Sequence, residues 1–388
     1  MELKAFYALM DKTKKVKKRL VDNALSEKKT DKDLKLLVKY KAELEAMPRS
    51  RGKYIITSNG KKLLFDLSYE LGELKKDIDY FEKGEERFIR KMTEKKKDIN
   101  PEKESANVVK RLKKKVFNCF ITDRDGTINN YCARYMSSVQ SAYNAIFLTR
   151  FVKELVGHAI VVTSAPLDGI VSLSINQEDI FIYAGSKGRE FLDEDGTKRT
   201  EAMTKEEKEL IDLLEERIVK LLDKKEYQRF GYIGSGFQKK FGQITVARQD
   251  MSGSIPKKES EAFLKKITGL VRELDPEEKR LAIEDTDLDI EVILTTGKKK
   301  AFDKGDGINY IAKTLDLKLN KGINLVCGDT GSDIALAEKT LAKNKDTEVI
   351  FVTTDMKLKR KVKMVAPKAM FVSSPDTLII TFYKLANQ

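Results

Sequence analysis

Several residue types are scarce in the sequence, and each shortage excludes a class of protein. Among 388 residues there are only 7 Pro and 22 Gly, while 41% are hydrophobic, which excludes a disordered or collagen-like chain. The three cysteines, at 119, 132 and 327, form neither a metal-binding spacing nor an even disulfide set, and so predict reduced thiols. The single histidine, His158, lacks a neighbouring nucleophile for a catalytic triad, and we interpret it as a structural loop residue.

Long apolar runs are also missing. No stretch approaches the roughly 18 apolar residues that a membrane-spanning helix needs, and residues 1–18 lack the apolar core of a secretory signal. We therefore expect a cytoplasmic protein without a transmembrane segment. The length predicts two or three domains.

The basic charge is concentrated in the first third of the chain. Residues 1–115 hold 33 Lys and Arg against 20 Asp and Glu, a net charge of +13 out of +14 for the whole chain. The Lys clusters carry no interleaved aromatic residues and no nucleic-acid motif, which argues against nucleic acid as a partner. We interpret the charge as a solvated face on long helices and keep docking to an acidic partner or anionic surface open.

The first third of the chain is predicted to be helical. Apolar residues recur at steps of three and four between residues 6–20 and 34–44, and most clearly between 67 and 92. A turn-rich segment, 48–60, separates the second helix from the third. We predict an N-terminal helical bundle or coiled coil over 1–98, with a role in oligomerisation or docking, and a basic linker over 99–115.

From residue 116 the pattern changes to short apolar strands alternating with amphipathic helices. This predicts an α/β fold with a Rossmann-like parallel sheet, formed by 116–167 and 301–388. The expected strands are at the following positions: 116–122, 159–163, 180–184, 323–327, 349–353 and 370–372. The intervening segment, 168–300, reads as α-β-β-α-β-β, an inserted α+β unit with antiparallel hairpins.

The strongest chemical signal is the segment 120–127, which ends an apolar strand in Asp123 and Asp125. Gly126 can supply a turn there without steric cost. Ligands of open α/β sheets bind beyond the carboxyl ends of the strands, where one carboxylate can attack an electrophile and the other can manage a proton. Cys132 follows closely, and we expect its oxidation to perturb activity.

A second strand, 323–327, also ends in carboxylates. Asp329 and Asp333 flank a glycine-containing loop that opens a helix. Carboxylate oxygens suit Mg²⁺, although Asp333 could instead cap the helix. Two weaker signals are the hydroxyls of Thr163 and Ser164 at another strand end, and Lys304 just before a helix; both could hold a phosphate.

Together and in this order, these elements resemble the haloacid dehalogenase-like superfamily, whose members mostly transfer phosphoryl groups through an aspartyl-phosphate. The resemblance covers about 116–388 and implies that Asp123 is the nucleophile and Asp125 the general acid/base. It also implies a phosphate site at Thr163 or Ser164 with Lys304. The implied Mg²⁺ site comprises Asp123, Asp125 (through its backbone carbonyl), Asp329 and the supporting Asp333.

The inserted unit, 168–300, occupies the position of a C2-type cap and resembles that of trehalose-6-phosphate phosphatases. The resemblance implies that the cap and its neighbouring loops bind a small-molecule sugar phosphate. The resemblance of the cap rests on three segments: 183–190, 238–248 and 288–292. The implied substrate-binding residues are Lys187, Gly188, Glu190, Lys240, Arg248 and Glu291.

Departures from that family's pattern keep other functions open. The family usually has Ser-Gly-Arg where this chain has Thr163-Ser164-Ala165. It usually has His-Tyr-Arg where this chain has Ala247-Arg248-Gln249, and Arg-Pro where this chain has Ile293-Leu294. The leading hypothesis is an Mg²⁺-dependent phosphatase for trehalose 6-phosphate. The alternatives are a phosphatase for another glycosyl phosphate, of the sucrose 6-phosphate or mannosyl-3-phosphoglycerate type, and a scaffold protein that acts through its basic helical domain.

Overall fold

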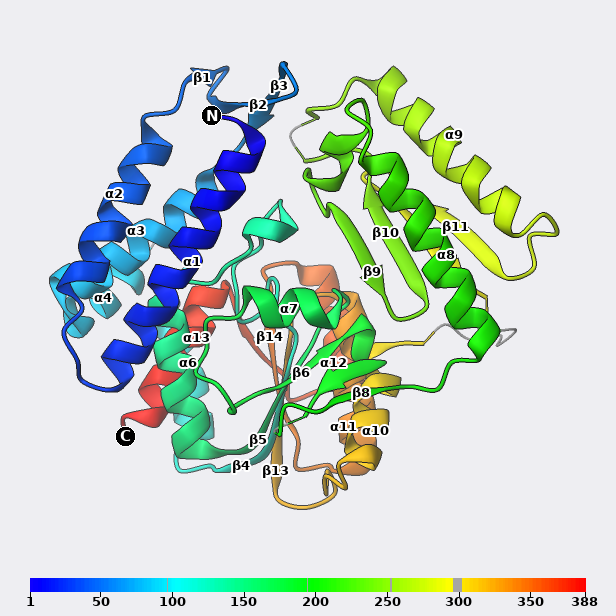
Figure 1. The fold of residues 1–388 in the computed structure, drawn as a ribbon. Coiled ribbons are helices and arrows are strands. Elements are labelled where there is room, and N and C mark those ends of the chain that lie inside the picture. Colours follow the sequence, from blue (N-terminus) through cyan, green and yellow to red (C-terminus); the bar gives the residue numbers. More distant parts are fainter. Residues whose placement is uncertain (96, 194, 252, 296–301) are drawn as a thin grey trace.

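The computed structural model describes residues 1–95, 97–193, 195–251, 253–295 and 302–388. It contains a central sheet with helices on both faces, a smaller sheet covered by two helices, and an N-terminal helical unit (Figure 1). The N-terminal unit contacts both other parts, through Glu70 with Arg134 of the core and Lys61 with Glu259 of the smaller unit.

The central sheet has eight strands in the order β15-β14-β13-β4-β5-β6-β7-β8. The pairs from β15 through β6 are parallel, and β7 and β8 add an antiparallel edge. The strands are β4 (Phe117–Thr122), β5 (Val156–Val162), β6 (Ile182–Gly185), β7 (Glu190–Leu192), β8 (Lys198–Thr200), β13 (Ile323–Gly328), β14 (Glu348–Val352) and β15 (Met370–Val372). The predicted α/β fold with a largely parallel sheet is therefore confirmed.

Helices cover both faces of this sheet because its strands are apolar on both sides. Phe120 of β4 contacts the rings of Phe151 and Phe382 on one face. Its neighbours Cys119 and Ile121 point to the other face and join a separate apolar cluster. The helices of the first face are α5 (Pro101–Leu112), α6 (Ala142–Leu155) and α13 (Pro375–Ala386), and those of the second are α10 (Lys304–Thr314), α11 (Ile334–Lys343) and α12 (Met356–Val365). A short helix, α7 (Leu167–Leu173), contacts β6 and β7.

Helix α5 lies where the sequence predicted a linker. Asn100 caps it by accepting a hydrogen bond from the Lys103 amide, and Pro101 occupies its first turn. Val108 and Leu112 are buried in the core cluster. Part of the predicted linker is thus a packed helix of the core, because its apolar residues are spaced for one face. His158 likewise lies within β5 and not in a loop.

The smaller unit is a four-stranded antiparallel sheet, ordered β11-β12-β10-β9, with two helices on one face (Figure 1). Its elements are α8 (Lys205–Leu222), β9 (Phe237–Lys240), β10 (Gln243–Ala247), α9 (Lys257–Leu274), β11 (Leu281–Asp285) and β12 (Asp289–Leu294). The order α-β-β-α-β-β matches the prediction. The predicted start at 168 is wrong, because β6, β7 and β8 pair with the core sheet. We call this unit, from residue 201, the cap.

The N-terminal unit contains more than the predicted helices. Its helices are α1 (Leu3–Leu25), α2 (Asp31–Glu45), α3 (Ser68–Lys83) and α4 (Glu85–Met92), and its strands are β1 (Arg49–Ser50), β2 (Lys53–Ser58) and β3 (Lys61–Phe65). Gly84, at φ +78°, separates α3 from α4 within the predicted third helix. Asn59 and Gly60, both at positive φ, turn β2 into β3 and form a hairpin that was predicted only as a turn. No helix in the described ranges combines the length and apolar character needed to cross a membrane.

Candidate active site

Two predicted motifs meet at one edge of the core sheet. Strands β4 and β13 are parallel neighbours, so Asp123 and Asp329, which follow them, lie at the same strand ends. The Asp123 amide donates a hydrogen bond of 3.1 Å to the Cys327 carbonyl. Carboxylate oxygens of Asp123, Asp329 and Asp333 all lie within 4.8 Å of one another. We call these three residues the carboxylate cluster.

Gly126 allows the chain to turn closely past this cluster. It adopts φ +86°, and a Cβ atom there would lie 2.1 Å from Asp329 Oδ2. The next residue, Thr127, donates a hydrogen bond of 3.0 Å to Asp329 Oδ1. Glycine is therefore required at 126 both for the left-handed backbone and for the approach to Asp329.

Lys304 is the only cation shown in direct contact with the cluster among the described residues. Its Nζ lies 2.6 Å from Asp123 Oδ1 and 2.6 Å from Asp333 Oδ1. The position follows from the start of α10, where Asp303 caps the helix by accepting a hydrogen bond from the Asp306 amide. Burial opposes the charge of Lys304, but the two carboxylates outweigh it and raise the pKa of the ammonium group.

The cluster carries more negative charge than Lys304 can balance. Burial raises the pKa of Asp123 well above its usual range, with Lys304 opposing and Asp333 adding to the shift. Burial and the charge of Asp333 raise the pKa of Asp329 to about 6. When all three carboxylates are ionised, they carry two more negative charges than Lys304 balances, so the oxygen donors and the charge both fit a hard divalent cation.

Asp333 organises the loop that holds Asp329. Its Oδ2 accepts hydrogen bonds from the amides of Asp329, at 3.1 Å, and Thr330, at 2.9 Å, while its Oδ1 faces Lys304. A Cβ at Gly328 would lie 2.3 Å from the Asp333 Cβ, so the loop closes tightly on this side chain. Asp333 makes no side-chain cap on α11, the role that the sequence left open. It instead closes a capping box with Thr330 at the turn Gly331–Asp333 and faces Lys304.

The side chain of Asp125 lies apart from the carboxylate cluster. Its Oδ1 accepts hydrogen bonds from Arg124 at 2.5 Å, Ser138 at 3.0 Å and Asn129 at 3.3 Å. The metal-binding group formed by the other three carboxylates does not include it. Among the described residues, the side chain of Asp125 is therefore no part of the carboxylate cluster, and its backbone carbonyl remains the candidate metal ligand.

The two candidate phosphate hydroxyls follow β5, the strand next to β4. Thr163 is buried, and its Oγ1 accepts a hydrogen bond of 3.2 Å from the Ala165 amide. Its carbonyl accepts a hydrogen bond of 2.8 Å from the Lys187 amide. Thr163 and Ser164 thus lie at the edge of the sheet that carries Asp123, beside the loop that carries Lys187.

The structure assigns internal contacts to two predicted substrate residues. Gly188 approaches α10 so closely that a Cβ there would lie 2.7 Å from the Gly307 Cα. Glu190 Oε1 accepts hydrogen bonds from Ser186 Oγ at 2.7 Å and from the Leu167 amide at 3.2 Å. Both residues hold the loop after β6 in place, which explains their residue types without a ligand.

The cap sheet presents a polar face that includes Lys240 and Glu291. Their charged groups are 3.9 Å apart, and Gln243 donates a hydrogen bond of 2.8 Å to Glu291. Burial lowers the pKa of Lys240, Glu291 and Asp289 oppose this, and Lys187 of the core contributes to the lowering. Next to Lys240, the turn between β9 and β10 contacts the core loop that carries Lys187, since the Phe241 amide donates a hydrogen bond of 2.8 Å to Ser186 Oγ.

Arg248 lies on the opposite face of the cap sheet. It follows Ile244 and Val246 at steps of two, and it shares their orientation toward the helices. Its guanidinium contacts Asp285 at 2.8 Å and Ser260 of α9 at 3.2 Å. The alternation of side chains along the strand thus places Arg248 in the interior of the cap, and the prediction that it binds substrate is not supported.

Two further candidates emerge only from the structure. Asp289 Oδ1 is buried and has no hydrogen-bond partner among the described residues, which makes it a ready acceptor for a ligand hydroxyl. Tyr131 is exposed, and partial burial of its hydroxyl together with the charges of Asp125 and Asp289 raises its pKa. Asp289 could have been found from its two-residue spacing to Glu291, whereas no sequence signal marks Tyr131.

Cys132 is poorly placed for reaction. Burial raises the pKa of its thiol to about 12, so the reactive thiolate is strongly disfavoured. The expectation that Cys132 is a redox-sensitive thiol is thus not supported. Cys119 and Cys327 are buried in core strands, as predicted.

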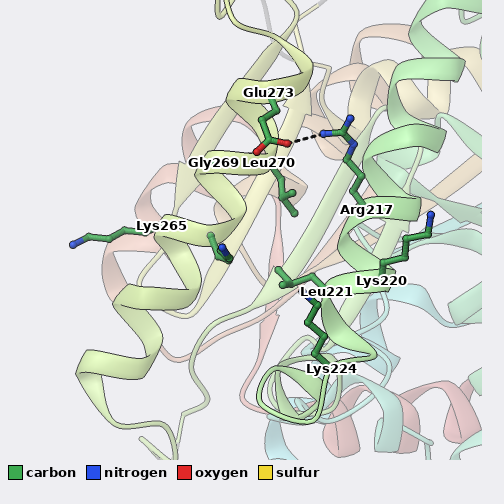
Figure 2. Close-up of a pocket in the computed structure, with 9 residues that line it drawn as sticks. Arg217, Lys220, Leu221, Lys224, Lys265, Gly269, Leu270 and Glu273 are labelled. Carbon is green, nitrogen blue, oxygen red and sulfur yellow. Dashed lines mark hydrogen bonds and ion pairs between the residues drawn. The ribbon is translucent and has the colours of Figure 1, made fainter.

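A groove of about 530 Å³ lies elsewhere, between α8 and α9 of the cap (Figure 2). Its lining includes Arg217, which bonds to Glu273 at 2.9 Å, and several lysines, among them Lys265, which points away from the groove in Figure 2. It belongs to the helical layer of the cap, away from the carboxylate cluster. The chemistry therefore does not lie in this groove.

The parallel sheet, the acidic strand ends, the buried lysine and the inserted cap form the arrangement that the resemblance to the haloacid dehalogenase-like superfamily implied. A family model described as "Trehalose-6-phosphate phosphatase, C-terminal" matches residues 120–378. A second, the "Trehalose-6-phosphate phosphatase N-terminal helical bundle domain", matches residues 2–99. The chain belongs to the trehalose-6-phosphate phosphatase family.

Similar proteins carry related names. The chain is 30% identical to alpha,alpha-trehalose-phosphate synthase (UDP-forming) 1 of Caenorhabditis elegans, over 97% of this chain and 30% of that protein. It is 29% identical to the trehalose-phosphatase of Brugia malayi, over 69% of this chain and 56% of that protein. The solved C-terminal domain of C. albicans trehalose-6-phosphate phosphatase matches with a TM-score of 0.48 and 12% identity, over 73% of this chain and 97% of that chain. This chain spans about a third of the length of the relatives named as synthases.

Proposed function

We propose that this chain is an Mg²⁺-dependent phosphatase that hydrolyses trehalose 6-phosphate to trehalose and inorganic phosphate. The observation that carries the proposal is the buried carboxylate cluster with Lys304 at the ends of β4 and β13. Membership of the family supports trehalose 6-phosphate as the substrate. The polar face of the cap is suited to bind a ligand rich in hydroxyl groups.

In this proposal, Asp123 and Asp329 hold Mg²⁺ together with the backbone carbonyl of Asp125, and Asp333 supports them. The bound ion would neutralise the negative charge of the substrate phosphate and of the cluster. Lys304 contributes a fixed positive charge from within the protein, and Thr163 or Ser164 offers a hydroxyl to a phosphate oxygen. These groups let an anionic nucleophile approach an anionic substrate.

In the first step, a carboxylate oxygen of Asp123 attacks the phosphorus atom. The bond between phosphorus and the sugar oxygen breaks, and Asp125 donates its proton to that oxygen, so the sugar leaves as a neutral alcohol. The product on the enzyme is an aspartyl-phosphate at Asp123. Asp125 suits this role because its carboxyl group is held by Arg124, Ser138 and Asn129, outside the carboxylate cluster.

In the second step, Asp125 removes a proton from a water molecule, and the resulting hydroxide attacks the phosphorus atom of the aspartyl-phosphate. The bond between phosphorus and the Asp123 carboxylate breaks, which releases inorganic phosphate and restores the carboxylate. Asp125 ends the step protonated and ready for the next substrate.

The cap supplies the sugar-binding surface. Phe241, in the turn between β9 and β10, donates its amide hydrogen bond to Ser186 Oγ of the core at 2.8 Å, so the cap contacts the core beside Lys187. Lys240, Glu291 and Asp289 can then bond sugar hydroxyls, while Lys187 approaches from the core side. Closure over the site would exclude bulk solvent while the aspartyl-phosphate forms.

Phosphate release from a panel of sugar phosphates, with Mg²⁺ and with EDTA, tests the proposal. We expect Mg²⁺-dependent turnover of trehalose 6-phosphate that exceeds turnover of sucrose 6-phosphate and mannosyl-3-phosphoglycerate at least about tenfold in kcat/KM. Preference for another sugar would keep the mechanism and change the substrate. Absence of release from every substrate would overturn the proposal and favour a scaffold role.

The same panel with E291Q tests the role of the cap face. We expect E291Q to raise KM for the preferred sugar roughly tenfold, because it weakens hydrogen bonds to sugar hydroxyls. E215Q is the matched control, since Glu215 pairs with Lys239 at an exposed position on α8. An unchanged KM in E291Q would exclude Glu291 from substrate binding.

A further inference from the structure

One face of α3, in the N-terminal unit, is lined by polar side chains that contact the core. Tyr69, Glu70, Glu73 and Asp77 recur at helical spacing. Glu70, Glu73 and Asp77 are 4%, 4% and 0% exposed, respectively. Carboxylates are rarely buried so completely without partners that require them. Asp77 pairs with Lys17 of α1 at 3.2 Å and Glu73 with Lys76 at 2.7 Å, and their other partners lie in residues 129–143. This segment follows the turn of Asp125, and we call it the Asp125 loop.

The acidic side chains of α3 bind the Asp125 loop at several points. Glu70 accepts hydrogen bonds from Arg134 Nη2 at 2.7 Å and from Ser137 Oγ at 2.6 Å. Glu73 accepts a hydrogen bond of 3.1 Å from Asn130 Nδ2 and another from the Ser141 hydroxyl. These charge-assisted bonds fix the loop against the helix.

Tyr69 extends this contact to the catalytic carboxyl group. Its hydroxyl lies 3.0 Å from Asn129 Oδ1 and 2.9 Å from the Val139 carbonyl. Asn129 is fully buried, and its Nδ2 donates hydrogen bonds to Asp125 Oδ1 at 3.3 Å and to Ser138 Oγ at 3.2 Å. A continuous path of hydrogen bonds therefore joins the N-terminal unit to Asp125.

The path constrains one oxygen of Asp125. Arg124, Asn129 and Ser138 all donate to Oδ1. No hydrogen bond to Oδ2 is seen from the described part of the chain, so this oxygen can face the substrate. Holding one oxygen in place orients the other for proton transfer.

We propose that the N-terminal unit is a working part of the active site, in which Tyr69 acts through Asn129 to orient the carboxyl group of Asp125. Tyr69 is a positioning residue, since its hydroxyl touches Asn129 and the loop and does not reach the cluster. The inference rests on the proposed function, because it assumes that Asp125 donates a proton to the leaving sugar oxygen.

The test compares two leaving groups that differ in their need for a proton from Asp125. A sugar alkoxide must be protonated as it leaves, whereas p-nitrophenolate leaves readily without a proton. A change that only weakens the fold would lower kcat/KM for both substrates alike. A misoriented Asp125 lowers kcat/KM for the sugar phosphate alone.

The experiment compares full-length wild type, Y69F and Y40F with the preferred sugar phosphate and with p-nitrophenyl phosphate, in Mg²⁺. We expect Y69F to lower kcat/KM for the sugar phosphate about tenfold, with KM unchanged, and to change kcat/KM for the aryl phosphate by less than about threefold. Y40F is the matched control, since Tyr40 lies on α2 and takes no part in the contacts described above.

Each outcome decides a separate point. Equal losses on both substrates, or no loss on the sugar phosphate, would overturn the positioning role. Wild-type protein that releases no phosphate from any sugar phosphate would overturn the proposed function, and the inference with it. The melting temperature of Y69F should lie within about 4 °C of wild type, because Phe keeps the ring.

Discussion

The conformation of single residues controls the distances between the carboxylates. Gly126 and Gly328 each bring backbone against a carboxylate side chain, at positions where a Cβ would overlap Asp329 or Asp333. Lys304 then bridges Asp123 and Asp333 at 2.6 Å. The cluster is thus close-packed yet carries excess negative charge, a combination that favours binding a cation over local stability.

The variant D123N separates catalysis from folding. We expect kcat to fall at least about 10³-fold, because an amide cannot form the aspartyl-phosphate. Replacing the Asp123 carboxyl group by an amide leaves Lys304 paired with Asp333, so the free energy of unfolding should stay within about 1 kcal/mol of wild type. Measured kcat and thermal unfolding check both parts. Substantial turnover by D123N would contradict the assignment of the nucleophile.

At the scale of elements, the junction of α3 and α4 is held by a small ionic network. Gly84 separates the two helices. The carboxylate of Asp79, which precedes Gly84, forms ion pairs with Lys75 at 2.8 Å, with Lys91 of α4 at 2.7 Å and with Lys83. Burial raises the pKa of Asp79, but the hydrogen bonds from the three lysines outweigh it and lower the pKa below its usual value near 3.8. The network therefore ties the two helices together in its ionised form.

Lowering the pH should remove this contribution. Because the folded-state pKa of Asp79 is below the unfolded value, its stabilising effect is fully present above about pH 4 and is lost as the pH falls further. We expect D79N to reduce stability by about 1 kcal/mol at pH 7, and the difference from wild type to shrink below pH 4. Thermal unfolding at both pH values checks this. E43Q, which alters an exposed pair with Lys39, is the control.

In the cap sheet, the alternation of side chains along each strand determines on which face each residue lies. Lys240 and Glu291 lie on its polar face, whereas Arg248, at an even step from Val246, lies on the helical face. Sequence motifs alone placed all three in the substrate site. Side chains alternate between the two faces along each strand, so Arg248 points to the face opposite to that of Lys240 and Glu291.

At the scale of the whole molecule, the N-terminal unit is integrated with the core and the cap. Arg134, 4% exposed, has Glu70 of α3 as its partner, and Asn59 of the β2–β3 hairpin bonds to Gln228 of the cap at 3.0 Å. Lys76 reaches Asp376 of the C-terminal helix α13 at 2.9 Å. The unit therefore bridges parts of the molecule that are far apart in sequence.

Removal of residues 1–98 should consequently destabilise the remainder. The deletion leaves Arg134 without Glu70 and exposes the apolar surface beneath α3, so we expect the melting temperature to fall by about 10 °C or more. Thermal unfolding of the truncated chain checks this. E70Q, in the full-length chain, should lower the melting temperature in the same direction. A truncated chain with wild-type stability and kinetics would identify the N-terminal unit as an independent docking module.

The sequence by itself determined the six parallel core strands, the order of elements in the cap and the acidic motifs, but it did not place β7 and β8 in the core sheet. These features are local, because apolar runs specify strands and short Asp and Gly motifs specify the turns that follow them. Helix α8 (Lys205–Leu222) opens the cap, as the predicted order of elements requires. The β2–β3 hairpin and helix α5 were missed, since charged residues obscured their apolar spacing.

Only the tertiary structure decided which side chains meet. Lys304 contacts Asp123 across 181 positions of sequence, and Tyr69 reaches Asn129 across 60. The same packing gives Glu190 and Gly188 contacts within the protein, and among the described residues it leaves Asp289 Oδ1 without a hydrogen-bond partner. The physical reason is that burial, facing and charge balance depend on neighbours brought together by folding, and no local pattern of residues records which neighbours those are.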